Sequence, residues 1–430
     1  MWKWFRWVLL IIVVVGGEVF SFAAYKGMKH NQELGNKKNE GNGGINELKN
    51  ASLDKDLPAC PSDTSSLFTK PFMEGEKPDF IIPLGNSNES GHVVPVDHVY
   101  PSDNISGEIA PVYAPGKLTL IWVENKQVFT SATGEKVMPD FQLNFAPCRG
   151  INLAFIHLMK LSDKLSAAMA DPVDSNCDTS QKMDYGEING IQTYYITCHP
   201  NFRKVTVEPG ELIGYFGYEE NDRPFSGFDI GLYDYNKPAL GFINPVRYYN
   251  DTNHTACFAD YYIPELKAKY EAKFANMDPM SKKLIKRTSA PVCGQVMYDK
   301  AGTISGDWFK GPATKENITD NDALVLIRDN IQPELAKLSW ANVISFTFSP
   351  TNSGTVNREF TEVKSDGQIY CYQPPGSEKN TYIDKSGKTV TNETSKFLIQ
   401  LIDDTHLKAE RQSGVCGTNE AFSSPTEFQR

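Results

Sequence analysis

Residues 205–217 have the sequence Val-Thr-Val-Glu-Pro-Gly-Glu-Leu-Ile-Gly-Tyr-Phe-Gly, and this stretch indicates a β-rich fold. Pro209-Gly210 is a turn signal. Gly214 and Gly217 allow a positive φ angle or a close approach of the backbone. Four apolar residues flank the turn: Val205, Val207, Leu212 and Ile213. The pattern predicts a tight hairpin in a compact barrel. This structural role accounts for the Pro, Gly and apolar residues of the stretch, and none of them needs a catalytic role.

Strand signals continue on both sides of this stretch. From Cys60 to about Asp260, alternating apolar and polar runs, such as 117–123 and 192–197, are punctuated by Gly and Pro. After Ala290 the signal returns, at 292–297, 323–327, 343–348, 368–372 and 397–402. We therefore expect a mainly β protein with two domains: a barrel or sandwich at 58–262 and a smaller β-rich domain at 290–424.

Two segments carry a helical pattern instead. Within 159–169, Leu161, Leu165 and Met169 share one helix face. Residues 265–287 form the clearest helical stretch, and Pro279 should divide it into two helices. We expect a helical connector at 263–289 between the two domains.

The N-terminus has the features of an export segment. Residues 2–6 are basic and aromatic, and residues 7–17 form an unbroken apolar run that ends at Glu18. A membrane-spanning helix needs about 20 apolar residues, which residues 7–25 provide if Glu18 is tolerated. The uninterrupted run alone matches a secretory signal, whose apolar region has about 7–15 residues.

Both alternatives place the rest of the chain outside the cytoplasm, because Lys3 and Arg6 should stay inside. We expect residues 1–25 to be a single-pass transmembrane anchor, or a signal segment whose removal after residue 23 would give a secreted protein. Residues 26–57 are rich in Asn, Gly, Lys and Glu and have few large apolar groups. Such a segment cannot bury a core, so we expect a flexible tether.

The cysteines agree with export. The chain has eight, and none forms a C-x-x-C pair, which excludes zinc-ribbon and thioredoxin-like sites. An even number of dispersed cysteines in an exported chain favours disulfides over free buried thiols. We predict that sequence neighbours pair: Cys60 with Cys148, Cys177 with Cys198, Cys257 with Cys293, and Cys371 with Cys416. The net charge of −10 argues against nucleic-acid binding, which requires a basic face.

Five motifs occur in a characteristic order along the first domain. They are GHVVPVDHVY at 91–100, APVYAPG at 110–116, LAFIHL at 153–158, the stretch 205–217, and GFDIGLYD at 227–234. This order resembles the lysostaphin-type (LytM-like) zinc metallopeptidase domain, over roughly residues 84–235. The resemblance implies a duplicated-hybrid-motif fold, a β-barrel or sandwich. Its most specific parts are PVYAPG and VEPGELIG.

The site residues that the resemblance implies are altered in this chain. The family binds zinc through an early His, an Asp about four residues later, and the last His of an H-x-H strand. His98 matches the early His, but Ser102 stands where the Asp is expected. His92 and Asp97 offer an alternative pair.

The H-x-H strand is altered as well. Gly227 and Asp229 occupy the positions of its two histidines. His157 matches a histidine that assists catalysis in the family. Because carboxylate oxygen can bind zinc, His98, Asp97 or His92, and Asp229 form the candidate metal site. The alternative is that these are ordinary polar residues at strand ends.

Loss of both histidines of the last strand removes the usual geometry for activating a water molecule. We therefore expect a non-catalytic scaffold without a resident cofactor that binds a partner or organises the cell envelope, with peptidoglycan or a surface glycan or peptide as partner. A divergent zinc peptidase that cleaves cell-wall peptides is the alternative, and a purely structural surface protein is a third. Convergence of the five candidate residues on one point would separate these hypotheses.

The C-terminal domain resembles no family that we recognise. Trp308 and Tyr372 are candidates for lining a glycan or peptide groove, since aromatic rings provide large contact areas. Their alternative role is core packing.

Overall fold

The structure is a computed structural model, and the part of the chain that it describes is mainly β. The described residues are 56–75, 77–88, 92–102, 109–188, 190–217, 228–278, 281, 283–311, 322–376, 380–383, 389–392 and 394–430. The expected export segment at 1–25 and the linker as far as residue 55 lie outside these residues. No helix within them is long and apolar enough to cross a membrane.

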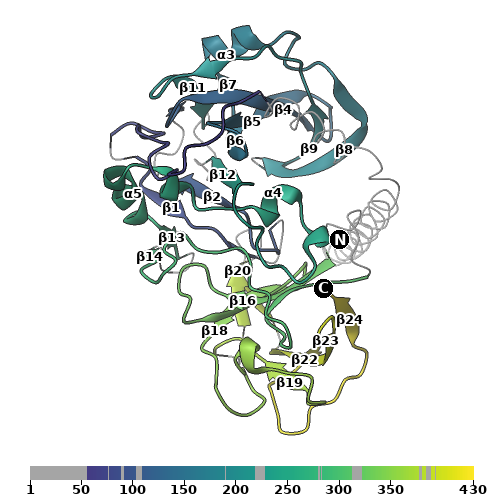
Figure 1. Ribbon diagram of the computed structural model, residues 1–430. Helices are drawn as coiled ribbons and strands as arrows, with labels where there is room; N and C mark the ends of the chain where they lie inside the picture. Colours follow the sequence, from purple (N-terminus) through teal and green to yellow (C-terminus); the bar gives the residue numbers. More distant parts are fainter. Residues whose placement is uncertain are drawn as a thin grey trace, which may run out of the picture. The chain divides into compact units, whose positions relative to one another are not determined.

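A large antiparallel sheet carries most of the first half (Figure 1). In the described residues its strand order is β1-β2-β12-β6-β5-β4-β9-β8, and β10 also pairs with β4. We call it the first sheet. Its strands are β1 (Phe80–Ile82), β2 (His98–Ser102), β4 (Leu118–Thr130), β5 (Lys136–Ala146), β6 (Ile151–Leu158), β8 (Cys177–Ile188), β9 (Ile191–Cys198), β10 (Thr206–Val207) and β12 (Asp229–Asp234).

A small sheet of order β3-β11-β7 lies beside it, with strands β3 (Ala110–Tyr113), β7 (Lys160–Leu161) and β11 (Leu212–Phe216). Gly210 has a φ angle of 83° in the expected turn. The hairpin prediction is nevertheless wrong, because β10 pairs with β4 whereas β11 pairs with β3 and β7. Gly214 allows this arrangement, since an added Cβ would lie 2.4 Å from the carbonyl oxygen of Lys160.

The helix expected at 159–169 is confirmed over its second half, as α3 (Asp163–Ala168). Its cap is local, because the side chain of Ser162 accepts a hydrogen bond from the backbone N–H of Leu165. Leu165 is fully buried in the main core. The apolar spacing thus predicted the buried face correctly, although residues 160–161 belong to β7.

The connector is helical only at its start. α5 (Pro264–Glu271) is followed by β13 (Ala275–Met277) and β14 (Leu284–Lys286), which pair with each other. The first expected helix therefore ends at Glu271, before Pro279, and the second is wrong because β14 lies in its place. Phe274 and Ala275 are fully buried, and the N–H of Ile81 donates to the carbonyl of Lys273. Pairing with β1 draws this segment into the core and overrides its helical propensity.

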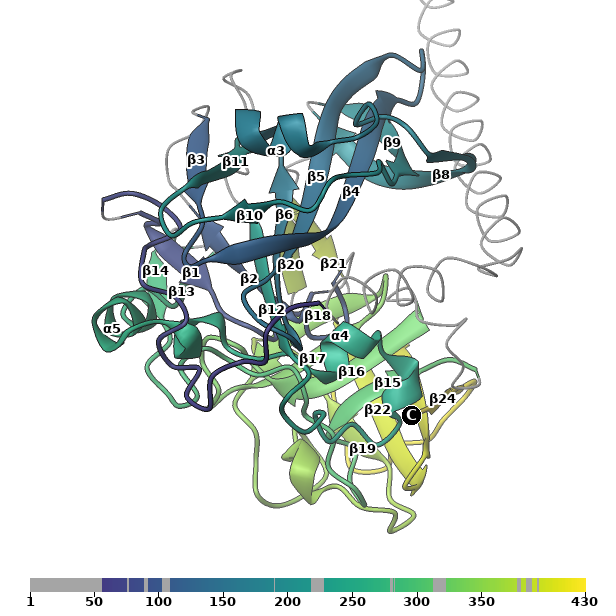
Figure 2. The ribbon, with the colours of Figure 1, turned by 45° about the horizontal axis from the view of Figure 1, so that its top comes forward.

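The second half forms another antiparallel sheet, which we call the second sheet (Figures 1 and 2). Its order in the described residues is β18-β17-β16-β15-β24-β23-β22-β19. The strands are β15 (Gly306–Phe309), β16 (Ala323–Arg328), β17 (Ala336–Trp340), β18 (Ile344–Phe348), β19 (Tyr370–Tyr372), β22 (Ser395–Asp403), β23 (His406–Ser413) and β24 (Thr426–Gln429). A separate pair is β20 (Asn380–Ile383) with β21 (Thr389–Asn392).

Four of the five strands expected after Ala290 are present. The fifth, at 292–297, is not a strand, and only Gly294 forms an isolated bridge there, with Leu84. Gly294 has a φ angle of 79°, which a regular strand does not accommodate. The backbone instead turns at this point and packs against the segment that leads toward β2.

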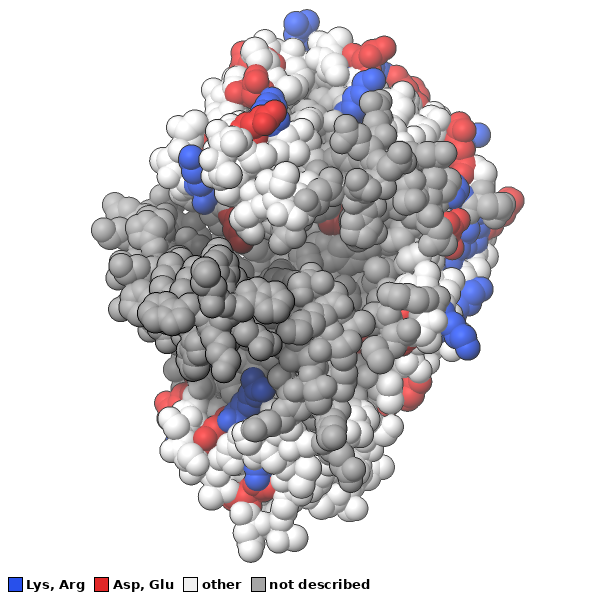
Figure 3. Space-filling view, turned by 180° about the vertical axis from the view of Figure 1, so that it is seen from behind, with Lys and Arg blue, Asp and Glu red and all other residues white. Residues whose placement is uncertain are grey.

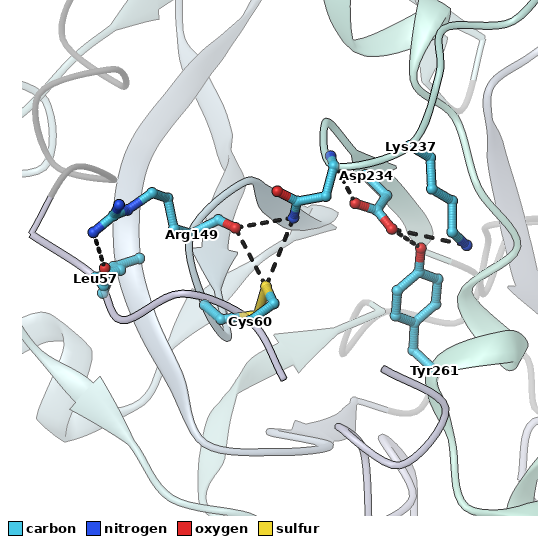
Figure 4. The surroundings of a disulfide bond; sticks show 8 residues. Leu57, Cys60, Arg149, Asp234, Lys237 and Tyr261 are labelled. Atoms are coloured by element: carbon cyan, nitrogen blue, oxygen red, sulfur yellow. Dashed lines mark hydrogen bonds and ion pairs between the residues drawn. A yellow bond between two sulfur atoms is a disulfide. The ribbon is translucent and has the colours of Figure 1, made fainter. Parts of the chain in front are cut away.

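All four predicted disulfides are confirmed, and the described residues contain no free cysteine. Figure 4 shows the surroundings of Cys60, which is bonded to Cys148. The guanidinium of Arg149 donates to the carbonyl of Leu57 at 2.9 Å, and Leu57 is buried against Ile121 and Ala146. The folded region therefore already includes Leu57, the last residue of the expected linker.

The two sheets share a core. The main apolar cluster includes Phe155 and Phe228 from the first half and Phe309 and Val325 from the second. The other side of the second sheet has a cluster of its own, in which Trp308 is fully buried. Described residues of both halves thus belong to one compact unit.

Candidate functional site

A β-bulge in the first sheet sets the position of His157. Along β5 and β6, Phe141 pairs with Leu158 and Leu143 pairs with Phe155, so β6 has one extra residue between these pairs. His157 lies in this bulge with a φ angle of 67°, which is uncommon for a residue other than glycine. Bulges of this kind redirect side chains next to functional sites. The strained backbone at His157 is thus a local signal of function.

Alternating carboxylates and imidazoles extend from β2 across β12 to β5. Nδ1 of His98 lies 3.1 Å from Oδ1 of Asp97, and its Nε2 lies 3.4 Å from Oδ2 of Asp229. The same Oδ2 is 3.2 Å from Nε2 of His157, whose Nδ1 is 2.9 Å from Oδ2 of Asp140. We call these five residues the Asp–His cluster. Each imidazole has a carboxylate on both of its nitrogens.

This arrangement favours the protonated form of both histidines. Burial alone would lower the pKa of His157, but the charges of Asp229 and Asp140 and their hydrogen bonds raise it to about 10. For His98, the charge of Asp229 and the hydrogen bond that its ring donates to Asp97 likewise outweigh burial and raise the pKa. The His157 ring therefore carries a positive charge at neutral pH when no other ion is bound, and protonation of His98 is favoured in the same direction.

The three carboxylates are correspondingly ionised. Burial opposes this, yet the neighbouring imidazolium groups lower the pKa of Asp97, Asp140 and Asp229. The side chains of Asp140 and Asp229 are 1% and 3% exposed, so their charges depend on these partners. His98 and His157 supply them from within the cluster.

A second polar group adjoins the cluster at Asp140. The hydroxyl of Tyr185 on β8 donates to Oδ2 of Asp140 at 2.9 Å, and Lys126 on β4 is opposite Asp140 in the strand register. Burial opposes protonation of Lys126, but the charges of Asp140 and Glu124 raise its pKa. Nζ of Lys126 also lies 5.5 Å from the ring centre of Tyr195, which is a cation–π contact.

His92 lies at the rim of the cluster. Its exposed ring is 5.8 Å from the ring of His98 in an edge-on arrangement. The surrounding protein and the positive charge of His98 lower the pKa of His92. His92 is therefore the neutral histidine of the group.

Thr252 supports the cluster from outside the first sheet. It belongs to α4 (Asn250–Asn253), and its hydroxyl donates to Oδ2 of Asp97 at 2.5 Å. Asp97 thus uses one oxygen for His98 and the other for Thr252. This contact fixes the plane of the carboxylate and, through it, the ring of His98.

The structure brings together all five histidine and aspartate candidates that the sequence indicated: His92, Asp97, His98, His157 and Asp229. Ser102 donates to the carbonyl of Tyr100. Gly227 lies outside the described residues.

The groove expected at Trp308 and Tyr372 is corrected by the structure. Both side chains are fully buried in the core of the second sheet. The indole N–H of Trp308 donates to the carbonyl of Ile304 at 2.8 Å, and Tyr372 packs against Phe348 and Phe360. Neither ring is available to a ligand at the surface.

Sequence reasoning missed Asp140, Lys126, Tyr185 and Thr252. None of them belongs to the motifs that carried the resemblance. Only Asp140 had a usable signal, because it is a charged residue next to the apolar Phe141 inside a strand. The pairing of β4 with β5, which makes Lys126 and Asp140 neighbours, was not visible in the sequence.

The fit of a metal ion to the cluster is partial. Two atoms that each lie about 2.0–2.1 Å from a tetrahedral zinc ion are about 3.3 Å apart. The separations of the two Nε2 atoms from Oδ2 of Asp229, 3.4 and 3.2 Å, match this value. Nε2 of His98 and Oδ1 of Asp229 are also buried without a hydrogen-bond partner. In the described residues, however, no three His, Cys, Asp or Glu side chains form a preformed metal-binding group.

The charged surface has no dominant sign on the face in Figure 3. Lys and Arg are interspersed there with Asp and Glu among the described residues.

Comparison of the chain with family models, with curated proteins and with solved structures gave no match in any of the three.

Proposed function

We propose that this chain is a membrane-tethered extracytoplasmic protein whose metallopeptidase-like scaffold binds a partner or organises the cell envelope without hydrolysing it. The observation that carries the proposal is the position of Asp229 between two imidazoles. The carboxylate there is the counter-ion of His98 and His157. The cluster is thus electrostatically satisfied by its own protons.

A metal ion would have to displace those protons. Metal coordination requires a deprotonated imidazole nitrogen, and the same charge of Asp229 that would attract a metal also raises the pKa of His157 to about 10. The exchange of histidine for aspartate at position 229 therefore strengthens the competition from protons. This is the physical reason to prefer a binding role over a hydrolytic one.

The location rests on the disulfides. Four of them close loops throughout the described part of the chain, and such bonds persist in oxidising compartments. The apolar segment at 1–25 would supply the membrane anchor. With this location and a net charge of −10, peptidoglycan or a surface glycan or peptide is the partner that we propose, at the side of the cluster where His157 is 32% exposed.

A divergent zinc metallopeptidase is the second candidate. It is favoured by one observation, namely that Asp97 and Asp140 hold the Nδ1 atoms of both histidines while the Nε2 atoms converge on Asp229. Histidine ligands of metal ions are commonly held by carboxylates in this way. In this alternative, His98 and Asp229 would hold the ion beside His157, and zinc would polarise a peptide carbonyl or activate water.

One experiment separates the two candidates. The purified full chain, supplemented with zinc and dialysed, is analysed for bound metal and incubated with peptidoglycan. We expect less than one zinc per chain, no new amino termini, and sedimentation of the chain with the insoluble peptidoglycan. His157→Ala should weaken this sedimentation, whereas the matched control His406→Ala, at an exposed position in the second sheet, should not. Release of amino termini that both a chelator and His157→Ala abolish would instead establish the peptidase.

A further inference from the structure

We infer that the second sheet positions the Asp97–His98 arm of the cluster, and that Thr252 is the positioning residue through which it acts. This inference assigns a role to the C-terminal half. It rests on the proposed function only in taking the Asp–His cluster as the site.

The first step is the direct contact of Thr252 with the cluster. Its hydroxyl donates to Oδ2 of Asp97 at 2.5 Å, and Oδ1 of the same carboxylate contacts Nδ1 of His98. Thr252 is 7% exposed, so no solvent molecule replaces it easily. Rotation of the Asp97 carboxylate would break both contacts together.

The second step is the attachment of α4, which carries Thr252, to the preceding 3₁₀ turn η1 (Pro245–Arg247). The side-chain amide of Asn253 donates to the carbonyls of Pro245 and Tyr249, at 3.0 and 3.1 Å. Asn253 is 7% exposed. These bonds make α4 and η1 one rigid segment, although α4 itself is only one turn long.

The third step ties this segment to β15 of the second sheet, next to which it lies in Figure 2. The hydroxyl of Tyr248 donates to Oδ2 of Asp307 at 3.0 Å. The guanidinium of Arg247 lies 4.3 Å from the ring centre of Phe309, and its Nη2 donates to the carbonyl of Gly311. Arg247 is 1% exposed. The segment that carries Thr252 is thus tied to β15, in addition to the backbone bonds that join its C-terminal end to β12, such as the one from the N–H of Asp234 to the carbonyl of His254.

A separate contact reaches the same arm from the other side. The loop before β2 carries His92 and Asp97, and within it the N–H of Val96 donates to the carbonyl of Asn86. Ser87 in this loop lies 3.0 Å from the hydroxyl oxygen of Ser339 on β17. Both serines are at most 1% exposed. The second sheet therefore holds both the loop and α4.

The other arm is built differently. Asp140 and His157 belong to β5 and β6, which pair with each other in the middle of the first sheet, and Tyr185 reaches Asp140 from β8 of that sheet. The two arms share the carboxylate of Asp229. This asymmetry provides an internal control for any test.

The test observes the imidazole nitrogens directly, by ¹⁵N NMR of the full chain labelled at histidine, at one pH and with chelator present. Thr252→Val removes the hydroxyl from Asp97 with little change in shape, and Tyr248→Phe removes the link to Asp307. We expect each to shift the Nδ1 signal of His98 more than that of any other histidine. The matched control Tyr185→Phe should instead shift His157 most.

Folding is checked by circular dichroism, and Ser339→Ala provides an independent variant of the same arm. Equal shifts of His98 and His157 in Thr252→Val, or an unchanged His98 in both Tyr248→Phe and Ser339→Ala, would overturn the inference. The readout does not involve peptidoglycan or zinc. Failure of the proposed function would therefore leave this inference standing. Failure of this inference would likewise leave the proposed function standing.

Discussion

His98 and His157, which are carried by different strands, direct their Nε2 atoms at one and the same carboxylate oxygen, Oδ2 of Asp229. This sharing makes Asp229 the charge on which the cluster depends. A buried aspartate that is 3% exposed is stable in the ionised form only because two imidazolium groups surround it. Each imidazole, in turn, has Asp229 on one nitrogen and a second carboxylate on the other.

Replacement of that charge is the first prediction. Asp229→Asn keeps the shape of the side chain but leaves two buried cations without their common partner. We expect the pKa of both His98 and His157 to fall and the free energy of unfolding to decrease by about 3–5 kcal/mol, as for other broken buried ion pairs. Urea unfolding and histidine NMR titration measure the two effects. An unchanged pKa at both histidines would show that Asp229 is not their counter-ion.

The disulfides give the second prediction, which compares two loop lengths. Cys60–Cys148 spans 88 residues and Cys177–Cys198 spans 21. If the bonds stabilise by restricting the unfolded chain, the longer loop contributes about 1.3 kcal/mol more, within a usual range of about 2–5 kcal/mol. The double variants Cys60→Ser/Cys148→Ser and Cys177→Ser/Cys198→Ser, compared by urea unfolding at neutral pH, should differ in this direction. A larger loss for the short loop would contradict it.

Gly214 supports a third prediction. A Cβ at this position would lie 2.4 Å from the backbone oxygen of Lys160, whereas at Gly210 it would meet nothing closer than 3.8 Å. Gly214→Ala must therefore move a strand of the small sheet. Gly210→Ala costs only the strain of its positive φ angle, about 1–2 kcal/mol. We expect thermal unfolding to show the larger loss of stability for Gly214→Ala, and equal losses would mean that β7 moves freely.

Local patterns predicted much of the fold. Alternation predicted β4 and β9, and a continuous apolar run predicted β16, which is buried on both faces. Pairing of sequence neighbours predicted the four disulfides. The helical prediction for the connector after Glu271 failed for the opposite reason. Phe274 and Ala275 lie in a helical pattern, yet long-range contact with β1 determines their conformation.

The residues of the site also fall into two groups, those that sequence motifs indicated and those that only long-range contacts bring to the site. The order of three separate motifs indicated His98, His157 and Asp229, through the resemblance that these motifs carry together. Asp140 and Lys126 contribute through strand register, and Thr252 contributes through a contact across 155 residues of sequence. A single sequence does not display such pairings. The bulge that turns His157 toward Asp229 was invisible for the same reason, because it depends on how β6 aligns with β5.

The pH dependence of stability provides the last prediction. The pKa of His157 is raised from its usual value of about 6.5 to about 10 in the folded chain. The folded state therefore holds this proton more tightly than the unfolded state does. The resulting stabilisation is fully present below about pH 6.5 and is lost as pH rises from there through about 10.

The measurement is the free energy of unfolding in urea with chelator present, for the unaltered chain and for His157→Gln, at several pH values from about 6 to about 10. Glutamine retains an amide donor for Asp140 but carries no charge, and all other titrating groups are common to both chains. We expect the stability difference between them to be largest near pH 6 and to shrink steadily toward pH 10. A constant difference over this range would mean that folding does not raise the pKa of His157. Its Nε2 would then be free of a proton at neutral pH often enough to bind a metal ion, and the argument against a bound metal ion would lose its basis.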